Sequence, residues 1–306
     1  MKSFVIKIVI FSFSLFVGLI GLAYLSSYIV KQRHYQQWET DSNTLIMGKG
    51  QHYDIVLSGA SHARILSRHK NHLRLENILH KKIFNVGQGA ASCGVAEQYF
   101  YLKYFYDEKN TVDTVLYFLS PPLVFSNLLP IASNTFNYET FSLRFFFRYL
   151  RFDAENKEQR LFEYFRSKFT WKWIGLKPER SESMDVVLGK IDSTLIKDGI
   201  AKYYKLEGSD NRFKKSCDII EDEVKDIQAH HSQIVFIIPP AVFGKWPGHD
   251  KTLEFAKEMN QKYGCPYYDF SEIIQDPQLY LDHHHLNTKG VILFTENYLK
   301  PIFTHK

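Results

Sequence analysis

One serine early in the chain, and an Asp–His pair late in it, are residue types that could perform acyl-transfer chemistry. Ser61 follows three small residues, and Asp282 precedes His285 by three positions within a run of adjacent histidines. A carboxylate can orient an imidazole and stabilise its protonated form while the other ring nitrogen takes a proton from a serine hydroxyl. The chain thus offers a serine, Ser61, early and an Asp-x-x-His pair, Asp282 and His285, late, and these could act together if the fold brings them to one place.

The elements around these residues should bring them together. An apolar stretch over 53–58 predicts a buried strand, which ends at the small-residue turn before Ser61, and a helix is expected over 62–80. This order puts Ser61 at the carboxyl edge of a sheet and at a helix N-terminus, where backbone N–H groups favour developing negative charge. His62, the next residue, is a candidate cap or supporting residue. The Asp282–His285 loop precedes a last predicted helix, so it should reach the same edge.

Strands and helices alternate along most of the chain. Further strands are predicted over 82–87, 113–119, 233–238 and 266–270, and further helices over 95–106, 211–230, 251–263 and 287–299. Such alternation favours an α/β fold with a parallel sheet covered by helices on both faces.

Residues of about 126–215 interrupt this alternation. They are rich in aromatic and basic residues at spacings of three and four, which predicts a helical insertion. Two interpretations stay open. The insertion could pack its aromatic side chains onto the core. Alternatively, they could form a surface that faces a membrane or stacks on glycans.

The N-terminal segment is typical of a membrane anchor. Residues 8–30 are uncharged and mostly apolar, long enough to cross a hydrocarbon core of about 30 Å. Lysines and arginines lie on both sides, so charge gives no orientation. A cleavable signal peptide, with a weak small-residue site at Gly21-Leu22-Ala23, is the alternative. The apolar run continues past that site, which favours an uncleaved anchor.

We therefore expect a single-pass membrane protein. Residues 1–34 would form the anchor and its flank, and 31–52 a polar stem leading away from the membrane. Residues 35–306 would form one α/β domain of about 270 residues, a usual size for a large domain with an insertion.

Composition narrows the range of ligands. The 306 residues carry a net charge of only +5, and no nucleic-acid-binding motif accompanies it, so no nucleic-acid partner is expected. Three cysteines lie far apart without a metal-type pair. Histidines 283–285 are adjacent, and on an extended loop such side chains point in different directions, which suits a compact zinc site poorly. We expect neither a metal nor a cofactor.

Three blocks together resemble the SGNH/GDSL hydrolase superfamily over about 53–300, apart from the insertion. They are Gly59-Ala60-Ser61, Asn85-Val86-Gly87-Gln88-Gly89 and Asp282-His283-His284-His285-Leu286-Asn287. The resemblance implies a flavodoxin-like, three-layer parallel sheet and a Ser61–His285–Asp282 triad that forms an acyl-enzyme. It also implies that the backbone N–H of the Gly89 region serves the oxyanion hole, with Asn85 beside it.

The chain departs from the family pattern at two points. First, Ala60 replaces the usual Asp. Second, the Gly-x-Asn-Asp block is not visible, and Leu119-Ser120-Pro121 stands in its place. Ser120 is therefore a candidate oxyanion or substrate-binding residue. Loss of one oxyanion donor typically costs about 3 kcal/mol. A similar loss is familiar in membrane-anchored SGNH-like proteins of cell-envelope acylation, including those of teichoic-acid D-alanylation and alginate acetylation.

The resemblance implies two functions. One is a serine esterase or O-acyltransferase that acts on acyl esters of a cell-envelope glycan or glycolipid, with its domain outside the cytoplasm and other envelope-modification proteins as partners. The alternative is a non-catalytic SGNH-like binding or scaffold component of an envelope polymer modification complex.

Overall fold

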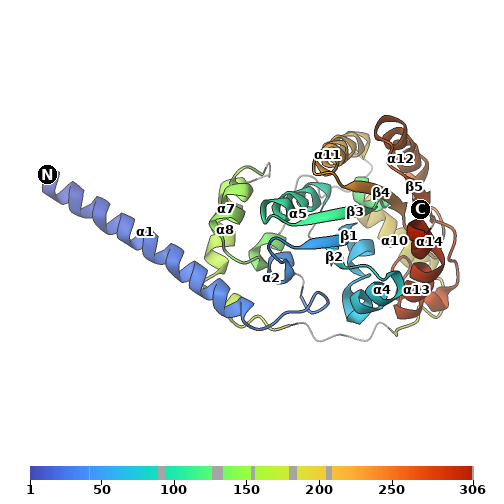
Figure 1. The fold of residues 1–306 in the computed structure, drawn as a ribbon, viewed down its shortest axis with the longest axis horizontal. Coiled ribbons are helices and arrows are strands. Elements are labelled where there is room, and N and C mark those ends of the chain that lie inside the picture. The colour runs from blue at the N-terminus through green and yellow to red at the C-terminus, as the bar shows by residue number, and fades with distance from the viewer. Residues whose placement is uncertain are drawn as a thin grey trace.

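The centre of the molecule is a parallel sheet of five strands (Figure 1). The computed structural model describes residues 1–40, 42–88, 94–125, 134–152, 156–178, 185–204 and 209–304. The strands are β1 (His52–Gly59), β2 (Ile83–Asn85), β3 (Thr111–Phe118), β4 (Gln233–Ile238) and β5 (Tyr267–Asp269). Each lies within about two residues of its predicted position, and all four neighbouring pairs are parallel.

Helices cover both faces of the sheet, as predicted (Figure 1). Alternate strand residues point to opposite faces, so Val56 and Phe236 lie in one apolar core while Leu57 and Ile237 lie in the other. The helices over the first core are α5 (Val95–Asp107), α11 (Ser209–Ala229) and α12 (His249–Tyr263). Those over the second are α4 (Asn71–Leu79) and α13 (Thr288–Phe294), which continues through η4 (Thr295–Leu299) into α14 (Lys300–Thr304). The result is a three-layer α/β fold.

The strand order is β2-β1-β3-β4-β5, the doubly wound order of flavodoxin-like sheets. The chain leaves β1 toward β2 on one side and returns to add β3 on the other. The connections diverge at this point, and in open α/β sheets ligands usually bind at the carboxyl ends of the strands beside such a divergence. Gly59 at the end of β1 pairs with Phe118 at the end of β3, so residues that follow either strand share this edge.

The prediction of a single helix over 62–80 is wrong. Three short pieces replace it: α3 (Ser61–Arg64), η1 (Arg68–Lys70) and α4. His69 and Lys70 have left-handed backbone angles, with φ of 54° and 66°, which breaks the helical path. The Asn71 amide then donates to the Ile65 carbonyl (3.1 Å) and holds the bend closed.

The aromatic insertion is helical and packs against α5. A short helix, α6 (Pro121–Val124), follows β3 and precedes the insertion, whose described elements are η2 (Asn134–Tyr138), α7 (Leu143–Leu150), α8 (Lys157–Ser167), α9 (Trp171–Ile174) and α10 (Ser193–Tyr203). The Phe100 ring of α5 lies 4.5 Å from the Phe136 ring and 5.0 Å from the Phe145 ring. Packing on the core therefore accounts for part of the aromatic content. Other aromatic side chains, including those of Phe147 and Phe162, are exposed.

The N-terminal helix α1 (Lys2–Lys31) is long and apolar enough to cross a membrane. It extends away from the body along most of its length, and its C-terminal end lies against the insertion (Figure 1). There Ser27 Oγ accepts from the Phe141 N–H (2.8 Å) and Tyr24 Oη accepts from the Leu143 N–H (2.8 Å). Arg33 also donates to the carbonyl oxygens of Ile174, the last residue of α9, and of Leu176. The helix thus joins the folded domain directly.

The polar stem predicted over 31–52 is wrong. Its centre contains a helical turn, α2 (Asn43–Ile46), and residues 42–45 are buried. The buried Glu139 carboxylate accepts hydrogen bonds from Ser42 Oγ (2.8 Å) and Thr44 Oγ1 (2.6 Å). Short polar residues look the same in a solvated stem and in a buried network, and only the distant carboxylate distinguishes the two.

Candidate active site

The turn after β1 presents Ser61 at the carboxyl edge of the sheet. Gly59 has a φ of +139°, and a Cβ on it would lie 2.8 Å from Phe118 Cβ, so only glycine fits between the two strand ends. Ser61 is the first residue of α3 and is half-buried. Because α3 has only four residues, its dipole is weaker than that of the long helix predicted there.

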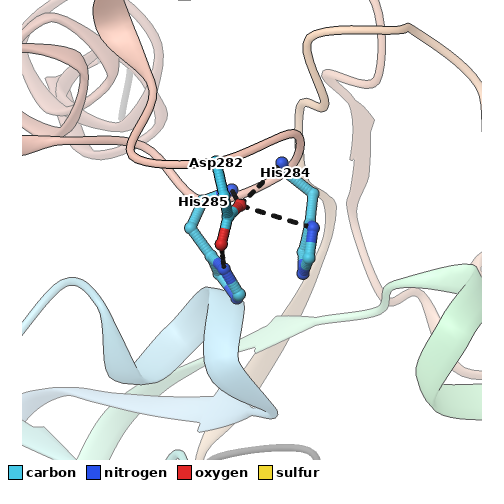
Figure 2. A group of neighbouring side chains, drawn as sticks. All are labelled: Asp282, His284 and His285. Atoms are coloured by element: carbon cyan, nitrogen blue, oxygen red, sulfur yellow. Dashed lines mark hydrogen bonds and ion pairs between the residues drawn. The ribbon is translucent and has the colours of Figure 1, made fainter. Parts of the chain in front are cut away.

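The loop over 281–285 holds Asp282 and His285 in a tight turn (Figure 2). Asp282 Oδ1 accepts from the backbone N–H of His284 (3.0 Å) and of His285 (2.9 Å), and Oδ2 lies 2.7 Å from His285 Nδ1. An antiparallel bridge between Tyr280 and Leu286 closes the base of the loop. One carboxylate therefore shapes the backbone and orients the imidazole.

Charges in the loop suit an acid–base pair. Burial alone would raise the pKa of Asp282, but the hydrogen bond from His285 and the charges of His285 and His284 outweigh it and hold that pKa below its usual range. The carboxylate therefore stays ionised and favours the tautomer of His285 that carries hydrogen on Nδ1. His285 Nε2 is buried and has no hydrogen-bond partner among the described residues. It is therefore not engaged by another group, and no hydrogen bond joins it to Ser61 in this structure.

His62 connects the serine turn with the histidine loop. Its ring lies 5.5 Å from the His285 ring and 5.4 Å from the His284 ring, although more than 200 positions separate them in the sequence. The side chain is buried, and burial, followed by the charges of His284 and His285, lowers the pKa of His62 well below its ordinary value. His62 is therefore neutral at pH 7. The structure brings the turn that carries Ser61 beside the loop that carries Asp282 and His285.

The adjacent histidines do not all point in different directions, contrary to expectation. The rings of His284 and His285 lie 3.9 Å apart, because the turn around Asp282 curls the backbone instead of extending it. One ligand atom each from Asp282, His284 and His285 lie within 4.8 Å of one another, a donor set that could hold a metal ion. An ion bound through Oδ2 and Nδ1 would replace the bond between Asp282 and His285.

The remaining predicted residues have different positions. Asn85 is buried; its amide donates to the Ala63 carbonyl (2.7 Å) and to Ser67 Oγ (2.6 Å), and Oδ1 accepts from the Gly87 N–H (2.8 Å). In this structure its contribution is to hold α3 against the end of β2. Gly89 lies outside the described residues.

Ser120 follows β3 at the same edge of the sheet as Ser61. It is buried and is the N-cap residue of α6. Its N–H donates to the Phe118 carbonyl (3.1 Å) and its own carbonyl accepts from the Leu123 N–H (2.9 Å). Ser120 therefore follows β3, the neighbour of β1, at the position where the resemblance leads us to expect the Gly-x-Asn-Asp block.

A large groove begins beside the histidine loop. It has a volume of about 1430 Å³, and its lining includes Trp246 and four cationic residues: Lys197, Arg212, Lys245 and Lys251. The Trp246 ring meets the His284 ring edge-on at 5.4 Å. The carbonyl of His283 accepts from the Val242 N–H (3.1 Å), which ties the loop after β4 to the histidine loop. Sequence reasoning missed Trp246 and His284, because a single tryptophan in a loop carries no signal of its partner.

Comparisons with known proteins add little to this picture. No protein-family model matches the chain, and no curated protein matches it. The fold is similar to a crystal structure from Bacteroides fragilis described as a "putative acylhydrolase", with a TM-score of 0.42 and 10% identity. That match covers 84% of this chain and 90% of the other. Values this low assign neither a family nor an activity, and the function must follow from the residues of the site.

Proposed function

We propose that the chain is a serine esterase or O-acyltransferase of the SGNH type. Ser61 is the nucleophile, His285 the general base and Asp282 the residue that orients His285. No cofactor or metal takes part in the proposed reaction. The sequence resemblance in the three blocks supports the same assignment.

One observation carries this proposal: the bonding state of His285. Nδ1 is occupied by Asp282 at 2.7 Å, while Nε2 is buried and unbonded within the described part of the chain. The His285 ring lies 5.5 Å from that of His62, the residue after Ser61. A histidine with one nitrogen fixed by a carboxylate and the other unengaged near a serine turn supports the proposal. The proposed step further requires Ser61 Oγ to come within hydrogen-bond reach of Nε2 when substrate binds.

The proposed reaction has two steps. Ser61 Oγ attacks the acyl carbonyl carbon while His285 Nε2 takes the hydroxyl proton. His285 then returns that proton to the departing alcohol oxygen as the ester bond breaks, which leaves the acyl group on Ser61. In the second step a water or a sugar hydroxyl loses its proton to His285 and attacks the acyl-enzyme. If water attacks, the protein is an esterase, and if a sugar hydroxyl attacks, it is an acyltransferase. In both cases His285 returns the proton to Ser61 Oγ as the acyl group leaves.

The oxyanion would be held by backbone N–H groups at the strand ends. Candidates are the N–H of Ser61 and a donor from the Gly89 region, with Ser120 at the neighbouring strand end. Asn85 contributes by fixing α3, since both hydrogens of its amide are used within the protein.

The substrate class we propose is an acylated glycan or glycolipid of the cell envelope. The apolar helix α1 supports a membrane location, with the domain on the extracytoplasmic side as the resemblance implies. The groove beside His284 is lined by four cationic side chains and one carboxylate, Asp250. Lys245 forms an ion pair with Glu272 (3.5 Å) and Lys251 with Asp210 (2.8 Å), so the support for an anionic substrate comes from Lys197, and Arg212 also contributes positive charge to the lining. Attraction between such a groove and an anionic polymer raises the rate of encounter.

The test uses purified full-length protein and two readouts, labelling by a fluorophosphonate probe and hydrolysis of an acetyl ester. Ser61→Ala should abolish labelling and lower kcat/KM by about 10³-fold or more, as loss of a catalytic serine does. Asp282→Asn should lower kcat by roughly 10³-fold to 10⁴-fold, because the wrong tautomer of His285 is then favoured. Chelation by EDTA should leave turnover unchanged.

Two control variants isolate these effects. Ser193→Ala removes an exposed serine from α10, and Asp276→Asn changes a carboxylate that caps a turn in the loop before Asp282; both should behave as the wild type. Equal turnover by wild type and Ser61→Ala would remove Ser61 from the mechanism. Absence of labelling and turnover in the wild-type protein would favour the alternative, a non-catalytic SGNH-like scaffold component.

A further inference from the structure

The segment 143–171 exposes large apolar side chains. Phe147 on α7 is 52% exposed, Phe162 on α8 is 62% exposed and Trp171 at the start of α9 is 86% exposed. Leu143, Leu150 and Phe169 are exposed as well. We call these six residues the apolar face, and three of them, Leu143, Phe147 and Phe162, line one apolar groove. Exposed apolar patches mark interaction sites, because water does not solvate them favourably.

The apolar face adjoins the part of α1 that would lie in lipid. An apolar groove of about 380 Å³ is lined by Phe16 and Ile20 of α1 together with Phe147 and Phe162. Crossing the hydrocarbon core takes about 20 residues, and every such window of the uncharged run 8–30 contains both Phe16 and Ile20. If α1 crosses the membrane, this groove lies at the level of the hydrocarbon.

The basic side chains of α7 point toward the body of the domain. Arg144 contacts Glu108 at 3.1 Å and Arg148 forms an ion pair with Asp107, both at the end of α5 in the body of the domain. The basic residues are thus paired toward the protein, while the side facing away is apolar. This division is that of an amphipathic helix lying in a membrane interface.

Two tyrosines lie in the C-terminal part of the apolar run of α1. Tyr24 accepts a hydrogen bond from the Leu143 N–H at the start of α7, and Tyr28 is exposed one turn later. Tyrosine and tryptophan are enriched where hydrocarbon meets water, and Tyr28 is the one of the two that lies near the end of the run. The start of α7 is therefore fixed about one turn of α1 before that boundary, on the hydrocarbon side.

From these observations we propose that α7 is embedded in the membrane leaflet next to the domain, beside α1, together with the Phe162 side chain of α8, and that a phospholipid acyl chain lies in the groove between α1 and these helices. The rest of the exposed side of α8 stays outside the hydrocarbon, because Glu158 and Arg166 are exposed one turn on either side of Phe162. The proposal rests on α1 crossing the membrane, and it is independent of the proposed catalytic activity. It gives the molecule a second membrane contact besides α1. The sheet, and the candidate active site at its edge, would then be held at a set height and orientation above the bilayer.

The test adds one tryptophan at a time to the full-length protein and measures quenching by brominated phospholipids. The protein is reconstituted in lipid nanodiscs at one copy per disc, in a Trp171→Phe background. That background keeps Trp38, Trp173 and Trp246, so its own emission and quenching are measured separately and subtracted from those of each variant. Phe162→Trp reports on the apolar face. Phe11→Trp, on the exposed surface of α1, is the positive control. Leu195→Trp is the negative control, because Leu195 is 56% exposed and belongs to α10, which lies on the far side of the body from α1 (Figure 1).

Phe162→Trp should lose emission to a degree comparable with Phe11→Trp, whereas Leu195→Trp should lose none beyond the background. Quenching of Phe11→Trp without quenching of Phe162→Trp would overturn the proposal and leave another protein, or a second copy, as the occupant of the apolar face. No quenching of Phe11→Trp would overturn the membrane crossing itself. All three substitutions are at exposed positions, so folding is not at risk from lost core packing.

Discussion

At the scale of single residues, His62 shows how burial tunes the candidate site. Its ring is enclosed beside His284 and His285, and the protonated form would lose its hydration while facing two further imidazoles. A neutral His62 leaves His285 as the group that takes up the proton. It also makes the stability of the fold depend on pH.

We predict that His62→Gln makes stability less sensitive to acid. The unfolded chain protonates this histidine near pH 6.5, whereas the folded chain does so only at lower pH, so the unfolded state binds more protons as pH falls. The free energy of unfolding should therefore fall by up to about 1.4 kcal/mol per pH unit below pH 6.5 in the wild type. Chemical denaturation between pH 7 and pH 5 would measure the slope, which should be shallower in His62→Gln.

His231→Asn removes an exposed histidine and serves as the matched control. Identical slopes for wild type and His62→Gln would show that His62 is not the buried neutral histidine described here.

At the scale of elements, the position of α3 depends on close contact with the loop after β2. A Cβ on Gly87 would lie 2.7 Å from Ala63 Cβ, 2.8 Å from Asn85 Oδ1 and 2.9 Å from the Arg64 nitrogen. These distances are too short for real contacts, so the glycine is required for α3 to sit against β2. The same packing sets the direction in which Ser61 leaves the strand.

Gly87→Ala should therefore lower both stability and activity. Overpacking at a tight contact costs about 1–3 kcal/mol, and relief of the contact must move α3 and with it Ser61. Thermal unfolding and ester hydrolysis measure the two effects. Gly199→Ala is the control, because nothing lies within 4 Å of its Cβ and it stands within α10; it should be neutral or stabilising by about 0.5–1 kcal/mol. Unchanged stability in Gly87→Ala would contradict the argument.

At the scale of the whole molecule, Glu139 joins three parts of the chain. Its buried carboxylate accepts from Thr44 N (2.8 Å) after α1 and from Tyr101 Oη (2.6 Å) on α5, and Glu139 itself belongs to the insertion. Tyr24 and Ser27 of α1 also accept hydrogen bonds from backbone N–H groups of the insertion. Together these bonds join α1, the insertion and the layer of the sheet and α5 into one connected unit.

Glu139→Ala should destabilise the protein by about 3–5 kcal/mol, because several buried donors lose their acceptor. Glu139→Gln keeps one oxygen and should cost less. Thermal unfolding gives the magnitude, and limited proteolysis should show faster cleavage within 31–52 in the alanine variant. Glu158→Ala, at an exposed position of α8, should change neither. Protection of 31–52 equal to that of the wild type would argue against this role.

Much of the fold follows from local patterns. The five strands, their alternation with helices and the length of α1 can be predicted because periodicity and composition act within a few residues. The pairing of Asp282 with His285 is equally local, since three positions in a turn bring a carboxylate to an imidazole. The resemblance of three short blocks added the expectation that Ser61 belongs with this pair.

The tertiary structure decided what depends on residues far apart in the chain. The break after Ser61, the burial of residues 42–45 around Glu139, and the contact of Trp246 with His284 each need a partner that no local pattern announces. Short polar and aromatic residues fit a surface and an interior alike, and only packing selects between them. Ser61 and the Asp282–His285 pair can therefore be identified by residue type, but the turn with His62 comes beside the histidine loop only through the parallel sheet.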